Sequence, residues 1–398
     1  MKRTILNPVL INKRAEKIRG LFPNSKPSAI KNGPVFGFGY RPPWLYGNII
    51  QAETAKKYKL NAIIAQQSAR EIERTQRSFR EVVDCGAISA YQAGLDIPWG
   101  ADGDHLRNEK ELEDAIGAGC THFTIDVSAE LKKGLDEVAS KVKRFCRRLD
   151  ESKQGGGYTT EISLDETEKE TPLEDIARLV ENLAKDKIRA DEIAPRFPGY
   201  FEKAVDYYYR REAGGRKIRD TEEFEKYLEN TAKAGREMNF RISVHSGSDK
   251  FSVYPLLAKA LGSNMHLKTA GTYYLEELKI VARRNTELFR EIYNFSLKQF
   301  MNDRATYELS ADSGKLPDMA KLNGKKISKL MESGTGSDDL RQVLHVTYGS
   351  VLTARNSRGV LVFSGRIARV LEENREEYSK EFRKHLLRHI KDFVKTKE

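Results

Sequence analysis

Short apolar and β-branched runs alternate with stretches of helical periodicity along most of the chain. We predict eight strands, each ended by turn or polar residues, at 34–39, 61–66, 97–101, 121–127, 159–164, 190–196, 240–245 and 265–269. Helical patterns separate them, including 67–83, 108–118, 129–150 and 172–185. Eight strands that alternate with helices favour a (β/α)8 barrel of the TIM type, an α/β fold, over an open doubly wound sheet.

Beyond the eighth strand the pattern is helical, from 272 to about 302, and again at 338–357, 360–372 and 375–396. We therefore divide the chain into an N-terminal extension (1–33), the barrel (34–300) and a C-terminal helical extension (301–398) packed on the barrel. His385 and His389 stand four residues apart in the last helix. That spacing can bind metal, but without a third ligand nearby in sequence we expect a solvent-facing pair.

The composition, with 39% hydrophobic and 32% charged residues, is typical of a soluble protein. No apolar run reaches the about 20 residues that cross a bilayer, and the first residues lack the features of a signal peptide. We therefore expect a cytosolic protein. Three widely spaced cysteines predict neither a disulfide framework nor a cysteine zinc site. The Lys- and Glu-rich composition is compatible with a thermostable surface.

A net charge of +11 favours anionic partners. Much of the excess lies in helical segments such as 129–150 and 375–397, where basic residues are mixed with acidic ones. This arrangement indicates solvated helix faces rather than a nucleic-acid footprint. We therefore expect no nucleic-acid partner and no membrane. A small acidic substrate is compatible with the charge, and a homo-oligomer stays open.

Two segments, RISVHSGSDK (241–250) and MHLKTAGT (265–272), each carry a histidine on a β-like run that ends in a loop of Gly, Ser, Thr or Lys. Either segment alone could be a turn with a satisfied histidine. Together they indicate a metal site beside an oxygen-rich substrate, because such loops expose backbone amides to anions.

In a barrel, functional residues lie where strands end. Glu161, His245 and His266 form an N/O set for a divalent ion such as Zn²⁺, Mn²⁺, Co²⁺ or Ni²⁺, and His105 or Asp126 could replace one of them. We expect His122, at the start of its strand, to be structural. No P-loop or GxGxxG sequence follows a strand, so no nucleotide cofactor is predicted.

Polar residues near the same strand ends complete the predicted pocket. The acid/base candidates are Asp126 and Asp104, with His345 from the C-terminal helices as a further pocket member or ligand. The residues expected to bind substrate are Arg41, Gln67, Ser128, Arg196, Ser246, Ser248, Lys250, Lys268 and Thr269. For each of these the alternative is an ordinary cap or a salt bridge at the rim.

Several of these motifs together resemble the tagaturonate epimerase family: AQQSAREIERT (65–75), QAGLDIPWGADGDHLRN (92–108), TTEISLDETEKETPLED (159–175), APRFPGYFEKAVDY (194–207), ISVHSGSDKFSVYP (242–255), HLKTAGTYYLEEL (266–278) and LHVTYGSVL (344–352). The resemblance covers most of the chain, and HSGSDKFS and KTAGT are its most specific parts. It implies a metal-dependent enzyme that interconverts D-tagaturonate and D-fructuronate at C4, with some activity on fructose and tagatose.

The chain departs from the family pattern after the first predicted strand. The family has an acid before the arginine and a histidine further on, whereas this chain has Tyr40 before Arg41 and then Asn48. We therefore expect two polar groups at the pocket rim to be replaced, with an altered substrate preference.

The reaction can be considered from its chemistry. In a 2-keto sugar acid C4 is β to the carbonyl, so C4 carries no acidic proton. Without a nicotinamide motif for transient oxidation, retro-aldol cleavage of C3–C4 and re-addition is the favoured route. The alternatives are another metal-dependent ketose isomerase or aldolase, and a non-catalytic polyanion-binding protein.

Overall fold

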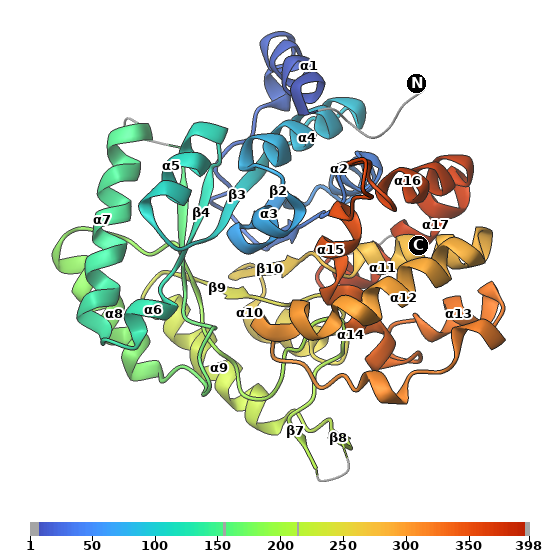
Figure 1. Ribbon diagram of the computed structural model, residues 1–398. Coiled ribbons are helices and arrows are strands. Elements are labelled where there is room, and N and C mark those ends of the chain that lie inside the picture. The colour runs from blue at the N-terminus through green and yellow to red at the C-terminus, as the bar shows by residue number, and fades with distance from the viewer. Residues whose placement is uncertain (1–7, 154–156, 213–214, 395–398) are drawn as a thin grey trace.

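Eight parallel strands close into a barrel in the computed structural model, which describes residues 8–153, 157–212 and 215–394 (Figure 1). Around the barrel the strand order is β1-β10-β9-β6-β5-β4-β3-β2. The bounds are β1 Val35–Phe38, β2 Asn61–Ser68, β3 Trp99–Leu106, β4 His122–Asp126, β5 Thr159–Ser163, β6 Glu192–Ala194, β9 Arg241–Val244 and β10 Met265–Thr269. Each predicted strand overlaps one of these, so the predicted barrel is confirmed.

Helices follow the strands on the outside of the barrel. They are α2 Tyr46–Tyr58, α3 Ala69–Thr75, α4 Phe79–Gln92, α5 Glu109–Ala118, α6 Ser128–Leu131, α7 Leu135–Lys153, α8 Leu173–Lys185, α9 Glu222–Glu237 and α10 Tyr254–Leu261. The helix expected over 67–83 is wrong in one respect, because it is two helices. Gln76 adopts a left-handed conformation, and the Ser78 side chain then caps a new helix by accepting the backbone N–H of Glu81.

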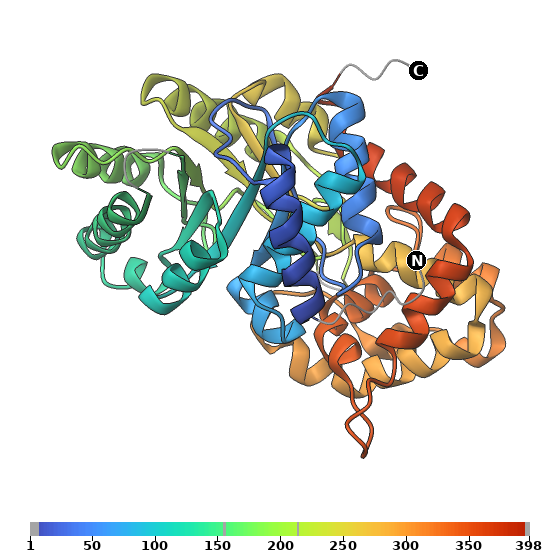
Figure 2. The same cartoon turned by 90° about the horizontal axis from the view of Figure 1, so that it is seen from above.

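The C-terminal helices gather on one side of the barrel (Figures 1 and 2). They are α11 Tyr273–Arg284, α12 Thr286–Asp303, α13 Gly324–Leu330, α14 Asp338–Val346, α15 Tyr348–Thr353, α16 Ser364–Glu373 and α17 Arg375–Ile390. The predicted end of the last helix, 395–396, lies outside the described residues. At the other end of the chain, α1 (Pro8–Leu21) packs on α4.

Other short elements complete the chain. A small hairpin of β7 (Arg210–Arg211) and β8 (Lys217–Ile218), which the sequence did not predict, follows β6. Short 3₁₀ turns lie at Pro23–Ser25, Arg304–Thr306, Ser313–Lys315 and Met319–Lys321. Among the described residues no helix is long and apolar enough to cross a membrane. The division into residues 1–33, 34–300 and 301–398 stays a prediction.

The barrel strands are buried except for Asn61, Ser68 and His105, which are half-buried, and their two faces differ in polarity. On β4 the apolar side chains of Phe123 and Ile125 belong to the core under the helices, whereas Thr124 of the same strand reaches across the barrel to Lys268 of β10. Because successive residues of a strand point to opposite faces, one face packs against helices and the other carries polar groups into the barrel interior. This alternation concentrates charge where water is excluded.

A buried carboxyl joins the barrel to the C-terminal helices. Glu277 of α11 accepts hydrogen bonds from the hydroxyls of Tyr40 and Tyr378 and from the indole N–H of Trp44. Burial raises the pKa of Glu277 to about 8 despite these donors. The folded protein therefore holds this carboxyl protonated at neutral pH. Tyr40, expected at the pocket rim, belongs to this core network instead.

The raised pKa of Glu277 predicts a pH-dependent stability. An unfolded glutamate has a pKa of about 4.3, so the stabilisation is complete below that pH and is lost as the pH rises toward 8. We expect the free energy of unfolding of the wild type to fall between pH 5 and 8 relative to Glu277→Gln, by at most about 1.4 kcal/mol per pH unit. Urea unfolding at several pH values measures it, with the exposed Glu223→Gln as control. Parallel wild-type and Glu277→Gln curves would contradict the prediction.

Candidate active site

A cavity of about 1150 Å³ opens at the carboxyl ends of the barrel strands. Of the residues predicted from sequence, those on its wall are Arg41, Asp104, Asp126, Ser128, Arg196, His245, Ser246, Ser248, Lys268 and His345. They come from the carboxyl ends of the barrel strands and the segments that follow them and, in the case of His345, from α14. The structure thus brings most of the predicted pocket together, including its contribution from the C-terminal helices.

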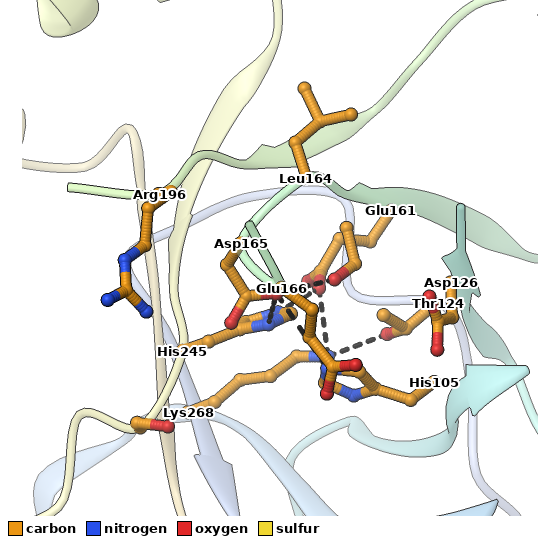
Figure 3. Close-up of polar contacts among 12 residues, drawn as sticks. His105, Thr124, Asp126, Glu161, Leu164, Asp165, Glu166, Arg196, His245 and Lys268 are labelled. Atoms are coloured by element: carbon orange, nitrogen blue, oxygen red, sulfur yellow. Dashed lines mark hydrogen bonds and ion pairs between the residues drawn. The ribbon is translucent and has the colours of Figure 1, made fainter. Parts of the chain in front are cut away.

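The floor of the cavity holds a histidine pair with one carboxylate. His105, Asp165 and His245 each offer one atom to a group whose atoms lie within 4.8 Å of one another. His245 Nδ1 is 3.0 Å from Asp165 Oδ1, and the two imidazole rings are 4.7 Å apart between centroids. Figure 3 shows these side chains gathered around the end of Lys268 together with Glu161. Asp165 was not assigned from sequence, although it stands two residues beyond Ser163 of β5 and accepts its hydroxyl at 2.6 Å.

His105 reaches the cavity because its strand is irregular. The pairing of β3 with β4 shifts register between Gly103 and Leu106, and His105 has a left-handed φ of +54°. A bulge of this kind re-aims a side chain. The predicted third strand ends at residue 101, but β3 extends through Asp102, Asp104 and His105. The two aspartates therefore share the interior face, and His105 turns upward beside Asp104, with Nδ1 2.8 Å from Oδ1.

A second group lies deeper in the barrel. His122, Glu161, Glu192 and His266 are completely buried and offer four atoms within 4.8 Å of one another. His266 Nδ1 is 2.7 Å from Glu192 Oε2 and 3.4 Å from Glu161 Oε2. His122, expected to be only structural, belongs to this group.

The predicted metal set of Glu161, His245 and His266 is therefore divided between two levels. His266 pairs in register with Ser243, two residues before His245, and one such step along a strand is about 6.6 Å. Glu161 connects the levels, because Oε1 contacts His245 Nε2 while Oε2 faces His266. His245 and His266 thus do not face one common position.

Lys268 is a buried cation in the barrel interior. Its Nζ lies 3.0 Å from Asp102 Oδ2, 2.8 Å from Asp104 Oδ1 and 3.0 Å from Glu161 Oε1, and it donates to Thr124 Oγ1 at 2.6 Å. Burial lowers the pKa of Lys268, but the three carboxylates raise it further, so its net pKa is well above the ordinary lysine value. The ammonium is fully engaged by these groups, which differs from the predicted role of holding a substrate carboxylate.

The protonation of the floor follows from the same charges. Burial lowers the pKa of His105, yet Asp104 and Asp165 raise it well above the ordinary value. The pKa of His245 is raised in the same way by Asp165 and Glu161, against burial. Burial raises the pKa of Asp104, but Lys268 and His105 bring it well below its usual range. These charges therefore favour the protonated form of both imidazoles, and a metal ion would have to replace those protons.

A second part of the cavity wall, called the cationic end below, is formed by basic residues. Arg41 stacks on Tyr348 at 4.0 Å and donates to Glu71, and its Nη1 is 3.2 Å from His345 Nε2. Burial, followed by the charges of Arg41 and Lys203, lowers the pKa of His345 well below its ordinary value, so this imidazole is neutral.

Lys203 is the basic residue that the sequence analysis missed. It lies on the cavity wall and its Nζ donates to Ser246 Oγ at 2.6 Å. Burial and then Arg41 and Arg70 lower its pKa. In the part of the chain that the structure describes, no carboxylate lies within ion-pair distance of this ammonium. It stands in an irregular segment after β6, where periodicity carries no signal.

Some predicted substrate contacts lie elsewhere. Gln67 donates to Thr75, and its strand neighbour Gln66 lines the cavity instead. Lys250 is buried and donates to the backbone carbonyls of Glu202, Val205 and Ser248, and Thr269 donates to that of Gly37. We therefore give Gln67, Lys250 and Thr269 positioning roles. Asn48, at a position where the family pattern has a histidine, is also buried away from the cavity.

The donor set at the floor suits a divalent metal ion. Two imidazoles and a carboxylate are ligands that Zn²⁺, Mn²⁺, Co²⁺ and Ni²⁺ accept, and three protein ligands leave positions for substrate oxygens. His245 Nδ1 is buried and makes no hydrogen bond of good geometry, although it lies within ion-pair distance of Asp165. The residues present therefore fit a metal ion at the cavity floor.

The network around Lys268 predicts a large loss of stability when its charge is removed. Lys268→Met leaves three buried carboxylates without their ammonium, which costs about 3 to 5 kcal/mol in the free energy of unfolding. Chemical unfolding measures the loss. Lys259→Met, which breaks the exposed pair with Glu225, is the control and should cost less than about 1 kcal/mol. Equal stabilities of the two variants would refute the balancing role of Lys268.

Comparisons with known proteins agree on one family. The family model described as tagaturonate epimerase matches residues 4–156 and 147–393. The tagaturonate/fructuronate epimerase of Thermotoga maritima is 34% identical over 425 aligned positions, which cover 94% of this chain and 84% of that protein. Crystal structures of the fructuronate-tagaturonate epimerase UxaE from Cohnella laeviribosi, native and with one glycerol, superpose with a TM-score of 0.84 at 27% identity. Each superposition covers 96% of this chain and 86% of that one.

Proposed function

This chain belongs to the tagaturonate epimerase family, and we propose that it interconverts D-tagaturonate and D-fructuronate by inverting C4 with a bound divalent metal ion. The observation that carries the proposal is the pairing of His105, Asp165 and His245 at the cavity floor with a cationic end formed by Lys203 and Arg41. One end suits the oxygens of the reacting carbons and the other suits the carboxylate of a sugar acid. The cytosolic location and a possible homo-oligomer stay predictions.

A metal ion would be held by His105, Asp165 and His245, while Glu161 contacts His245 from the deeper side. When bound, such an ion would act as a Lewis acid on oxygens of the substrate. The raised pKa values of both imidazoles mean that protons compete for the same nitrogens. Its identity among Zn²⁺, Mn²⁺, Co²⁺ and Ni²⁺ is left to experiment.

The substrate carboxylate lies at the cationic end. Lys203 is a half-buried ammonium near Arg41. No carboxylate of the described residues pairs with it, so the carboxylate of the substrate would supply the missing negative charge. The neutral His345 accepts from Arg41 through Nε2, which leaves its Nδ1–H, unpartnered and buried, to donate to a substrate oxygen. The hydroxyls of Ser128, Ser246 and Ser248 face the substrate hydroxyls between the two ends.

Inversion at C4 needs a base for the C4 hydroxyl. Asp104 is a weak proton acceptor, because Lys268 and His105 hold its pKa so low. Asp126 lies on the cavity wall with one oxygen bound by the N–H and hydroxyl of Ser128, so its second oxygen can accept the proton. We therefore assign proton transfer to Asp126 and the orientation of His105 to Asp104.

In the retro-aldol route these residues account for every proton that is transferred. Asp126 takes the proton of the C4 hydroxyl as the C3–C4 bond breaks. The electron pair of that bond moves to C3 and the C2 carbonyl, and C4 becomes an aldehyde. The aldehyde turns about C4–C5 and presents its other face while Lys203 and Arg41 retain the carboxylate. Re-addition forms the C3–C4 bond again, and Asp126 returns its proton to the C4 oxygen.

The proposal predicts a metal-dependent epimerase activity. Chelated enzyme reloaded with Zn²⁺, Mn²⁺, Co²⁺ or Ni²⁺ should convert tagaturonate to fructuronate without net cleavage, and Asp126→Asn should lower kcat about 10²- to 10⁴-fold while retaining bound metal. NMR of the products and metal analysis measure both results. The control is Asp114→Asn, an exposed residue of α5 paired with Lys110. Net C–C cleavage, or a shift of the carbonyl between C1 and C2, would instead identify an aldolase or ketose isomerase.

The proposed role of Lys203 predicts that the enzyme prefers a sugar acid to a neutral sugar. Lys203→Met should lower kcat/KM for tagaturonate about 10- to 100-fold, since a hydrogen bond to a charged group contributes about 1.5 to 3 kcal/mol. Activity on the neutral tagatose and fructose should change little, and Lys203→Arg should retain part of the uronate activity. Steady-state kinetics on both substrate types measure this. An equal loss on acid and neutral sugar would exclude Lys203 as the carboxylate site.

A further inference from the structure

Buried polar side chains need hydrogen-bond partners, and the two histidines of α17 have them. His385 and His389 are buried, so the expectation of a solvent-facing pair is wrong. His389 Nδ1 donates to the backbone carbonyl of His385 at 2.9 Å, and its Nε2 accepts the backbone N–H of Asp249 at 3.1 Å. His385 Nε2 lies 3.0 Å from the Thr272 hydroxyl. The surrounding chain therefore satisfies these imidazoles, and their helix face packs against the loop after β9.

Gln66 of β2 is a buried polar residue without such support. Its side chain lines the cavity although the residue is only 3% exposed. The amide oxygen is buried and lacks a hydrogen-bond partner among the described residues, and none of them accepts a hydrogen bond from the amide nitrogen. A buried amide that the protein leaves unsatisfied at a cavity wall indicates a partner that arrives with the ligand.

The strand register places this amide at the floor of the cavity. Gln66 pairs with Asp102 of β3, so both side chains are on the interior face, and Asp102 is an ion-pair partner of Lys268. The amide oxygen lies over Gly37 of β1, which is in register with Lys268 of β10. The amide therefore lies at the depth of Lys268, on the side of the barrel that β1 and β2 form.

Gly37 leaves the space that the amide occupies. A Cβ at this position would lie 1.9 Å from Gln66 Oε1 and 3.0 Å from His266 Nε2, which is also buried and unpartnered among the described residues. Gly37 does not have a left-handed φ, so the glycine is required by space and not by backbone conformation. The amide oxygen and His266 Nε2 thus share a dry corner of the barrel, which leaves the amide nitrogen as the end that can reach a ligand.

We propose that Gln66 is a further substrate-binding residue, which donates from its amide nitrogen to an oxygen of the hydroxyketone half of the substrate, C1 to C3, with Gly37 as its positioning residue. This inference rests on the proposed function, in which Arg41 and Lys203 retain the carboxylate at the other end of the sugar. Negative charge develops on the hydroxyketone oxygens as the C3–C4 bond breaks, so a donor at this point stabilises the transition state more than the bound substrate. Unlike Lys203, Gln66 contacts a part of the molecule that acidic and neutral ketoses share.

The test is steady-state kinetics of the metal-loaded enzyme on tagaturonate and on tagatose. Gln66→Leu should lower kcat about 10- to 100-fold on both substrates with little change in KM, the range expected when one donor to a charged oxygen is lost. Lys203→Met, in contrast, should affect the acid alone. The control is Gln92→Leu at the end of α4, outside the cavity, which should retain the wild-type kcat.

A double-mutant cycle tests the role of Gly37. Gly37→Ala should lower kcat about as much as Gln66→Ala, because the new Cβ displaces the amide. Gly37→Ala should cause little further loss in the Gln66→Ala background, where no amide remains to be displaced. Additive losses would show that Gly37 acts independently of Gln66 and would overturn its positioning role.

Two results would overturn the role of Gln66. One is a Gln66→Leu variant with the wild-type kcat on both substrates, or with a loss confined to tagaturonate. The other is a crystal structure of the wild type with bound fructuronate or fructose in which the amide nitrogen is beyond hydrogen-bond distance of every sugar oxygen, a measurement that does not depend on the folding of any variant. A wild type that binds the ketose without epimerising it would refute the proposed function instead, and the same map would still show whether Gln66 contacts the sugar.

Discussion

Charge balance inside a dry barrel is the constraint on which the rest of the structure depends. Asp102, Asp104, Glu161, Asp165 and Glu192 are carboxylates around one interior, and Lys268 and Arg241 are the permanent cations among them. Burying unpaired charge is costly, so the remaining negative charge has to be met by protons or by a cation. The raised pKa values of His105, His245 and His266 show that protons on these imidazoles can meet this charge.

The same balance of charges allows the barrel to bind a metal ion. A divalent ion that replaces protons on His105 and His245 restores neutrality without moving a strand, and Glu161 couples the floor of the cavity to the deeper group below it. The backbone at the rim is strained to serve this arrangement, since His105, Ser246 and Asp249 all have positive φ. Stability and site chemistry therefore rest on one electrostatic network.

Much of this could be predicted from the sequence. The strands are found because each is a short apolar run followed by polar residues, and the polar strand ends are found because barrel sites lie there. Three features lay beyond that logic. The bulge that turns His105 into the cavity leaves no periodic trace, Lys203 stands in irregular chain, and His389 is 140 residues from its partner Asp249. Gln66 and Gln67 show a smaller limit of prediction from sequence. Neighbouring residues of a strand point to opposite faces, so an error of one residue replaces the side chain in the cavity with one in the core.

The wall of the cavity comes partly from the last quarter of the chain. Arg41, near the beginning, meets His345 of α14 and lies on the ring of Tyr348 of α15. During synthesis all eight strands therefore emerge before the pocket has its far side. A ribosome-bound chain that has completed the barrel therefore has an open pocket, and the pocket is complete only after α14 and α15 have left the exit tunnel.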